Sequence, residues 1–256
     1  PHTKTLKSTS GVLNPGTIAY MSDASNGANA TTQANTVSFA GGEVVYNVEA
    51  GVNVDLTSDT VSGSGDFVKD GAGQLLFKGG HNASTLIKAG RLTLGSGSSL
   101  ADSKSVTING GATFDLDVSD VIGSISGTGD IELASGVTLS AGADNSSTTF
   151  DGVIRGDGGF IKQGTGTLSF SGVAPNAYTG ATSVEAGMLN LSGGSGLADA
   201  SALSVSSGAT FDLDVSDVIG SISGTGDIDL ASGVTLSAGA DNSSTTFDGV
   251  IRGDGG

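Results

Sequence analysis

The chain has 256 residues, a net charge of −16, 44 glycines, three prolines and no cysteine. Phosphate binding needs clustered Lys and Arg, yet only Arg155, Lys162 and Arg252 follow Lys104, which argues against a nucleic-acid partner. Without cysteine there are no disulfides, so packing and hydrogen bonds must hold the fold.

Residues 1–35 are rich in Ser, Thr, Asn and Ala, and we expect a loose N-terminal edge or an incomplete turn there. From residue 36 onward, short apolar–polar alternations are separated by Gly, Ser, Asp and Asn, a pattern typical of β-strands. Gly111–Gly159 returns as Gly208–Gly256, 97 residues later, with Asp229 in place of Glu132 as the single change. Such a repeat predicts an all-β solenoid over residues 36–256.

The repeat divides the solenoid into two units, at about residues 62–158 and 159–256. Four extra residues enter the second unit in the turn-rich stretch 173–176. Phenylalanines pair across the units: Phe67 with Phe160, Phe77 with Phe170, Phe114 with Phe211, and Phe150 with Phe247. Strand spacing indicates about three strands per turn and about four turns per unit, all parallel.

One strand shows how the faces divide. In the sequence ATFDLDV, Phe114 and Leu116 share one face and Asp115 and Asp117 share the other. A side-chain period of two buries one face and exposes the other. We therefore expect an inner column of Phe, Leu, Ile and Val and an outer surface of polar and acidic residues.

The stretch GDGGFIKQGTGTLSFSG, followed by AYTGATSVEAGMLNL, resembles the passenger-associated repeat of Gram-negative autotransporters, of the AIDA-type or adhesin-like kind. The first copy, from Gly63, fits through Gly79 but has HNAST where the repeat has its Tyr-x-Gly step. The residues that fill the pattern are Gly156, Gly158, Phe160, Lys162, Gly164, Gly166, Leu168, Phe170, Gly172, Tyr178, Gly180, Thr182, Val184, Gly187 and Leu189.

This resemblance implies a right-handed, single-stranded parallel β-helix. It also implies export to the cell surface by a C-terminal outer-membrane β-barrel translocator that lies outside this chain. The chain begins without a signal peptide and ends partway through a unit, so we expect a segment of a longer protein. Members of the family are adhesins, autoaggregation factors, or carriers of a protease or esterase domain.

Catalytic residues are scarce. A serine hydrolase needs Ser, His and Asp together, but the histidines are His2, near the chain start, and His81, which we expect in a solvated turn. The nucleophile motif GDSG is absent. We therefore expect no enzyme activity and no cofactor.

Two short motifs suggest ligands. Asp115, Asp117 and Asp120 could offer oxygens to calcium, although strand alternation already explains the first two, and the tandem calcium-roll repeat is absent, so we assign no metal site. The Arg-Gly-Asp tripeptide is a short integrin-recognition signal when it is displayed on an exposed turn. It occurs twice, as Arg155, Gly156 and Asp157 and as Arg252, Gly253 and Asp254. Arg and Asp also fill variable outward positions of the family repeat. The motif therefore has two interpretations, integrin recognition or ordinary variation of the repeat.

The favoured function is adhesion, autoaggregation or biofilm formation at the cell surface through the solvent faces of the rod. Its partners would be copies of itself on neighbouring cells, or host receptors and matrix. Two alternatives remain: a passive stalk that holds a distal domain away from the membrane, and integrin-type binding through Arg-Gly-Asp.

Overall fold

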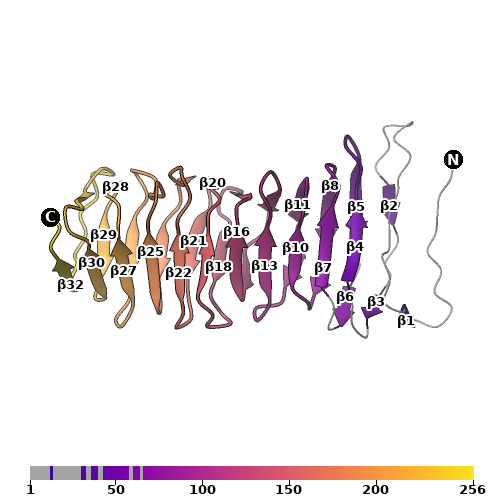
Figure 1. Cartoon of the computed structure of the whole chain (residues 1–256), viewed down its shortest axis with the longest axis horizontal. Helices are drawn as coiled ribbons and strands as arrows, with labels where there is room; N and C mark the ends of the chain where they lie inside the picture. Colours follow the sequence, from indigo (N-terminus) through magenta and orange to yellow (C-terminus); the bar gives the residue numbers. More distant parts are fainter. Residues whose placement is uncertain (1–11, 14–29, 33–35, 40–42, 58–59, 64–65) are drawn as a thin grey trace.

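The described strands stack in parallel along an elongated rod and follow one another in chain order from one end of its long axis to the other (Figure 1). The structure is a computed structural model that describes residues 12–13, 30–32, 36–39, 43–57, 60–63 and 66–256. Over these residues the regular secondary structure is entirely β. Within the same ranges, no helix has the length and apolarity needed to cross a membrane.

Two long sheets follow the rod. In the part of the chain that the structure describes, one sheet has 11 strands: β4 (Glu43–Asn47), β7 (Asp66–Asp70), β10 (Thr85–Ile87), β13 (Ser105–Ile108), β16 (Ser124–Gly127), β19 (Thr148–Phe150), β22 (Thr167–Phe170), β25 (Met188–Leu191), β27 (Thr210–Leu213), β30 (Asp227–Leu230) and β32 (Val250–Gly253). Over the same residues the other has eight: β2 (Ala30–Thr32), β5 (Asn53–Thr57), β8 (Gln74–Lys78), β11 (Arg91–Leu94), β14 (Thr113–Leu116), β17 (Asp130–Leu133), β20 (Ile154–Gly156) and β23 (Ala177–Tyr178).

Three shorter sheets complete the described part of the rod. Six strands form one of them: β15 (Asp120–Ile122), β18 (Thr138–Ala141), β21 (Gly159–Lys162), β24 (Thr182–Val184), β26 (Leu203–Val205) and β29 (Ile222–Gly224). The five-stranded sheet holds β1 (Val12–Leu13), β3 (Thr36–Phe39), β6 (Thr60–Gly63), β9 (Gly80–His81) and β12 (Ser99–Leu100), and the last sheet pairs β28 (Asp217–Ile219) with β31 (Leu236–Ala238).

Each turn of the chain adds one strand to a ladder and one layer to the core. Leu92 of β11 pairs with Phe114 of β14, which pairs with Ile131 of β17, and all three are buried. Removing such side chains from water contributes about 1.5–3 kcal/mol each. The strand pattern of alternating partly exposed and buried residues in β14 confirms the two faces expected from its sequence.

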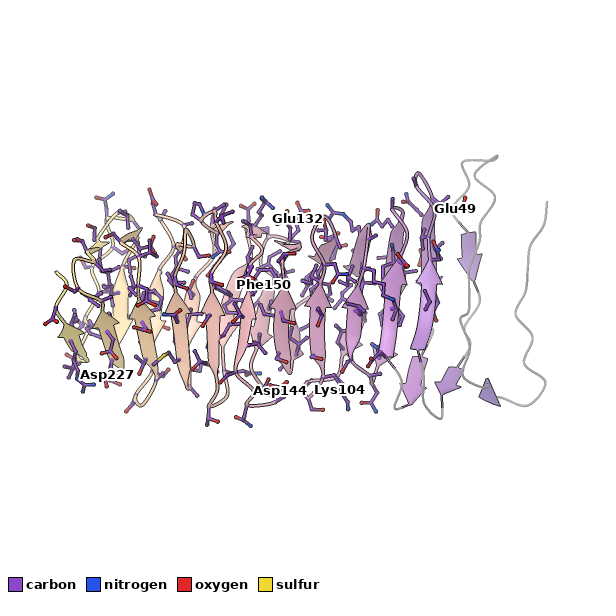
Figure 2. All side chains as sticks on the ribbon, in the orientation of Figure 1. Glu49, Lys104, Glu132, Asp144, Phe150 and Asp227 are labelled. Atoms are coloured by element: carbon purple, nitrogen blue, oxygen red, sulfur yellow. The ribbon has the colours of Figure 1, made fainter. Side chains whose placement is uncertain are left out.

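The four phenylalanine pairs confirm the expected core. Of the eight residues, all but Phe247 are buried, and Phe247 packs against the same cluster. Figure 2 shows Phe150 within the body of the rod and Glu132 at its margin. The rings contact one another between layers, as Phe150 and its register partner Phe170 do at a centroid distance of 6.2 Å.

The N-terminal edge expected over residues 1–35 lies mostly outside the described residues. Its two described strands join the rod: β1 pairs in parallel with β3, and β2 pairs in parallel with β5.

The 97-residue unit is not a whole number of turns, so the expectation of about four turns per unit is wrong. β14 lies in the eight-stranded sheet, whereas β27, which has the same sequence, lies in the 11-stranded sheet. Between them the chain passes through the 11-stranded sheet at β16, β19, β22 and β25. Each unit therefore spans more than four turns and fewer than five, and the same sequence faces a different side of the rod in each copy.

Candidate interaction surface

The charged residues of the first copy (Gly111–Gly159) form a ladder on the outside of the eight-stranded sheet. Strand register places Asp115 beside Glu132, and Glu132 beside Arg155. Arg91 reaches across from β11, with Nη1 3.0 Å from Asp115 Oδ2 and Nη2 2.8 Å from Glu132 Oε2. Partial burial would lower the pKa of Arg91, but hydrogen bonds and charge from Glu132 and Asp115 outweigh it and raise that pKa.

The second copy (Gly208–Gly256) repeats the acids without this arginine, because Met188 stands at the position equivalent to Arg91. Asn190 instead donates from Nδ2 to Asp212 Oδ2 at 2.9 Å and to Asp214 Oδ2 at 3.0 Å. Burial raises the pKa of Asp212, and the charges of Asp214 and Asp229 add to that shift. Nearly identical sequences thus have different electrostatic surroundings in the two copies.

Both Arg-Gly-Asp motifs lie at the ends of strands. Arg155 and Gly156 belong to β20, and Arg252 and Gly253 belong to β32, so the two motifs sit in different sheets. Arg155 forms an ion pair with Asp130, and its counterpart Arg252 lies 2.8 Å from Asp227.

The glycine of the first Arg-Gly-Asp motif also has a structural role. Gly156 has a φ of 100°, and a Cβ there would lie 2.1 Å from the carbonyl oxygen of Leu133. Asp157 is exposed and accepts a hydrogen bond from Thr179 Oγ1 at 3.1 Å. Ligand recognition by these tripeptides stays a prediction.

The lysine of the family repeat stabilises a corner of the rod by hydrogen bonds to backbone carbonyl oxygens. Lys162 is buried, and its Nζ donates to the carbonyl oxygens of Gln163, Gly164 and Ala186 at 2.8, 2.9 and 3.0 Å. Burial lowers its pKa to about 8. Lys69, its equivalent in the first unit, also contacts three carbonyl oxygens, and burial lowers its pKa to about 8 despite the opposing charge of Asp70.

The glycines of the repeat lie where successive turns come closest. A Cβ at any of them would approach a carbonyl oxygen of a neighbouring turn to 2.7 Å or less; they are Gly156, Gly158, Gly164, Gly166, Gly172, Gly180 and Gly187. Leu168 fills the core beneath them. In the structure, these predicted repeat residues therefore lie either at close contacts between successive turns or in the core.

Asp115, Asp117 and Asp120 do not converge on one site. Asp115 is bound to Arg91, Asp117 is exposed, and Asp120 is buried at the start of β15. Over the residues that the structure describes, no cluster of three or more His, Cys, Asp or Glu is arranged to hold a metal ion.

Asp120 and its equivalent Asp217 have a role that the sequence did not reveal. Asp120 Oδ2 accepts a hydrogen bond from the backbone nitrogen of Leu100 at 2.9 Å, and Asp217 Oδ2 does the same for Leu197 at 2.9 Å. In the first unit this bond lies where the five-stranded sheet ends and the six-stranded sheet begins. A side chain therefore continues the ladder across a break. Burial raises the pKa of both carboxyls to about 6, although these hydrogen bonds oppose the shift.

His81 is not in a solvated turn, so that expectation is wrong. It lies in β9, is 3% exposed, and packs against Phe67 and Phe77 at ring-centroid distances of 4.7 and 6.3 Å. His81 occupies the core position that Tyr178 occupies in the second unit, which the alignment of the two units could have indicated. His2 lies outside the described residues.

The comparisons with known proteins point to one family. The family described as Passenger-associated-transport-repeat matches residues 160–191. The chain is also 32% identical over 186 residues to the Adhesin BmaC autotransporter of Brucella suis biovar 1 (strain 1330). That match covers 70% of this chain but 5% of the relative, so the chain spans a small part of that protein's length. No solved structure is significantly similar to the chain.

Proposed function

Because the chain belongs to the autotransporter passengers that carry the passenger-associated transport repeat, we propose that it acts at the cell surface in adhesion, autoaggregation or biofilm formation. The relative's description as an adhesin supports the adhesive role. Its partners in this proposal are copies of itself on neighbouring cells, or host receptors and matrix. It works there without catalysis or a cofactor.

The observation that carries this proposal is the regular outer surface of the rod. One column of outward residues runs through Ile161, Ser183, Ser204 and Ser223 above the buried core. The Ser204 hydroxyl already donates a hydrogen bond to Ser183 Oγ at 3.0 Å. A single hydrogen bond contributes only about 0.5–1.5 kcal/mol, so adhesion through such groups requires many of them in register. A solenoid supplies that repetition.

We also propose that the solenoid is a right-handed, single-stranded β-helix with about three strands per turn. The pairing of β7 with β10, and of β10 with β13, supports the strand count. Right-handed connections between parallel strands of one sheet are strongly preferred because strands twist to the right.

The strongest alternative is a passive stalk. Duplication of a 97-residue unit lengthens a rod whether or not its faces bind anything. The test is to display the rod on bacteria that do not otherwise aggregate, with and without residues 112–208. That deletion joins two identical sequences, so each remaining strand keeps its neighbours in the chain.

The two functions differ in their response to this deletion and to surface charge. Self-association predicts that displaying cells settle faster than cells without the segment, and that settling slows when one solvent face is altered. A stalk predicts no settling from the segment alone and a dependence on rod length only. Settling that follows length but ignores every face substitution would contradict the adhesive role.

Integrin-type binding has its own test. The variant Asp157→Glu/Asp254→Glu keeps the charge but changes the geometry of both tripeptides. Because each arginine is already paired with an aspartate in the same sheet, we expect host-cell adhesion to be unchanged. A large loss of adhesion would favour integrin-type recognition instead.

A further inference from the structure

The two copies place their charged outward residues on different sheets. This placement determines which side of the rod carries no charged outward residues. In the first copy the outward residues Asp115, Glu132 and Arg155 lie on the eight-stranded sheet. In the second copy their equivalents lie on the 11-stranded sheet, as Asp212, Asp229 and Arg252. Each of these two sheets is therefore charged along part of its length.

The six-stranded sheet carries neither of these two sets of charged residues. Its central outward column, which we call the neutral face, runs in register across all six strands and both units; it consists of Val121, Ser140, Ile161, Ser183, Ser204 and Ser223. β18, β21 and β29 mark this sheet in Figure 1. The charged residues of its strands, Asp120 and Lys162, are buried. Asp144 and Glu185 lie beyond strand ends at its margins.

We propose that the neutral face is the surface through which the rod binds a second copy of itself. This inference rests on the proposed function and names its contact surface. A chain with a net charge of −16 repels its own copies, and the repulsion is smallest where the approaching surfaces carry no charge. Charge thus disfavours self-contact through the other two long faces, each of which carries acids along one copy.

The side chains of the neutral face suit a close contact between two rods. Four of the six are serines, of which Ser140 is buried and the other three are partly exposed, so the surface is flat and backbones can approach. Ser183 and Ser204 are hydrogen-bonded to each other at 3.0 Å, yet each hydroxyl can still bond a partner across an interface. Val121 and Ile161 are partly exposed and add apolar area. The same column on two rods related by a two-fold axis forms a self-complementary contact.

The size of the face indicates a weak contact that works by multiplicity. Six strands at a spacing of about 4.8 Å extend for about 24 Å, and one column with its flanks covers about 300 Å². Stable interfaces bury about 800 Å² on each partner, so an isolated pair would dissociate readily. Many copies on two apposed cells would multiply this contact into firm adhesion.

The chain offers a matched pair of variants for the test. Ser183→Glu/Ser204→Glu places two charges on neighbouring strands of the neutral face. Thr107→Glu/Ser126→Glu places two charges on neighbouring strands of the 11-stranded sheet, where the wild-type pair is also hydrogen-bonded, at 3.1 Å. Both variants add the same charge, and circular dichroism and thermal unfolding check that both fold alike.

We expect the neutral-face variant to settle like cells without the segment, because like charges across the contact weaken association about tenfold or more. The control variant should settle like the wild type. Equal loss in both variants would mean general repulsion and would overturn the proposal, as would no loss in either.

Cross-linking tests the contact independently of aggregation. The chain has no cysteine, so Ser183→Cys introduces the one thiol, and Ser126→Cys provides the control. Under mild oxidation of the concentrated protein, Ser183→Cys should form disulfide-linked dimers at least about tenfold faster, because only paired faces hold the thiols together. Equal rates would overturn the neutral-face contact. If wild-type cells do not settle although Ser183→Cys cross-links, the proposed function fails while the contact stands.

Discussion

Tyr178 Oη lies 2.7 Å from Thr182 Oγ1 in the buried core of the second unit. The equivalent positions of the first unit hold His81 and Thr85, and the hydroxyl of Thr85 has no hydrogen-bond partner within the described part of the chain. Burial raises the pKa of Tyr178, which keeps its hydroxyl neutral and able to donate. The two units thus differ in their side-chain hydrogen bonding at the same corner of the solenoid.

The variant His81→Tyr should therefore stabilise the first unit. A tyrosine would give Thr85 the hydrogen bond that Thr182 has, and a net hydrogen bond contributes about 0.5–1.5 kcal/mol. His81→Phe is the control, because it adds an aromatic ring without a hydroxyl. Urea unfolding should rank His81→Tyr above His81→Phe. If the phenylalanine variant is at least as stable, the hydroxyl has no part in the effect.

The core could be predicted from the sequence because its signal is local and repeated. Alternation in the strand around Phe114 and the pairing of phenylalanines across the units depend only on neighbouring residues and on a constant offset. The burial of seven of those phenylalanines follows directly.

The relative rotation of the units could not be predicted in the same way. It depends on how many strand positions each turn contains, and one corner near Leu197 has no assigned strand, although Leu100 at the equivalent position lies in β12. Asp217 and the side chain of Asn176 supply hydrogen bonds there instead of a ladder. Hydrogen bonds from side chains that replace backbone pairing leave no periodic signal in the sequence, so strand spacing predicted the wrong number of turns per unit.

Restoring the missing arginine should stabilise the second copy. Met188→Arg would place a guanidinium beside Asp212 and Asp229, as Arg91 lies beside Asp115 and Glu132. Because these groups are partly exposed, the expected gain is about 0.5–1 kcal/mol. The reverse change, Arg91→Met, should destabilise the first copy by a similar amount. Both effects should shrink in 1 M salt because of screening, at about a 3 Å Debye length, and effects independent of salt would contradict an electrostatic origin.

Replacing the corner lysine should weaken the rod strongly. Lys162→Met keeps the length of the side chain but leaves the carbonyl oxygens of Gln163, Gly164 and Ala186 without their donor. We expect a loss of about 2–4 kcal/mol in the free energy of unfolding, since buried acceptors left unpaired cost about 1–3 kcal/mol each and removal of a buried charge offsets part of this. Lys104→Met, at a partly exposed lysine, should change stability by less than about 0.5 kcal/mol. Equal effects at both lysines would exclude the corner role.

Acidification should stabilise the rod through Asp120 and Asp217. Their folded-state pKa values of about 6 lie above the ordinary value near 3.9, so between about pH 4 and pH 6 the folded chain binds more protons than the unfolded chain. The free energy of unfolding should then rise as the pH falls from 7 to 4.5, by about 1–2 kcal/mol for each carboxyl after an allowance for solvent screening.

The double variant Asp120→Asn/Asp217→Asn should lose this part of the pH dependence, because an amide can still accept the hydrogen bonds from Leu100 and Leu197 but does not titrate. Urea unfolding at a series of pH values measures the difference between variant and wild type. Asp117→Asn, at an exposed aspartate, is the control for loss of one negative charge. If the double variant and the wild type keep parallel pH profiles of unfolding free energy from 7 to 4.5, these two carboxyls do not determine the acid response. Other interactions must then stabilise the places where strand pairing is interrupted.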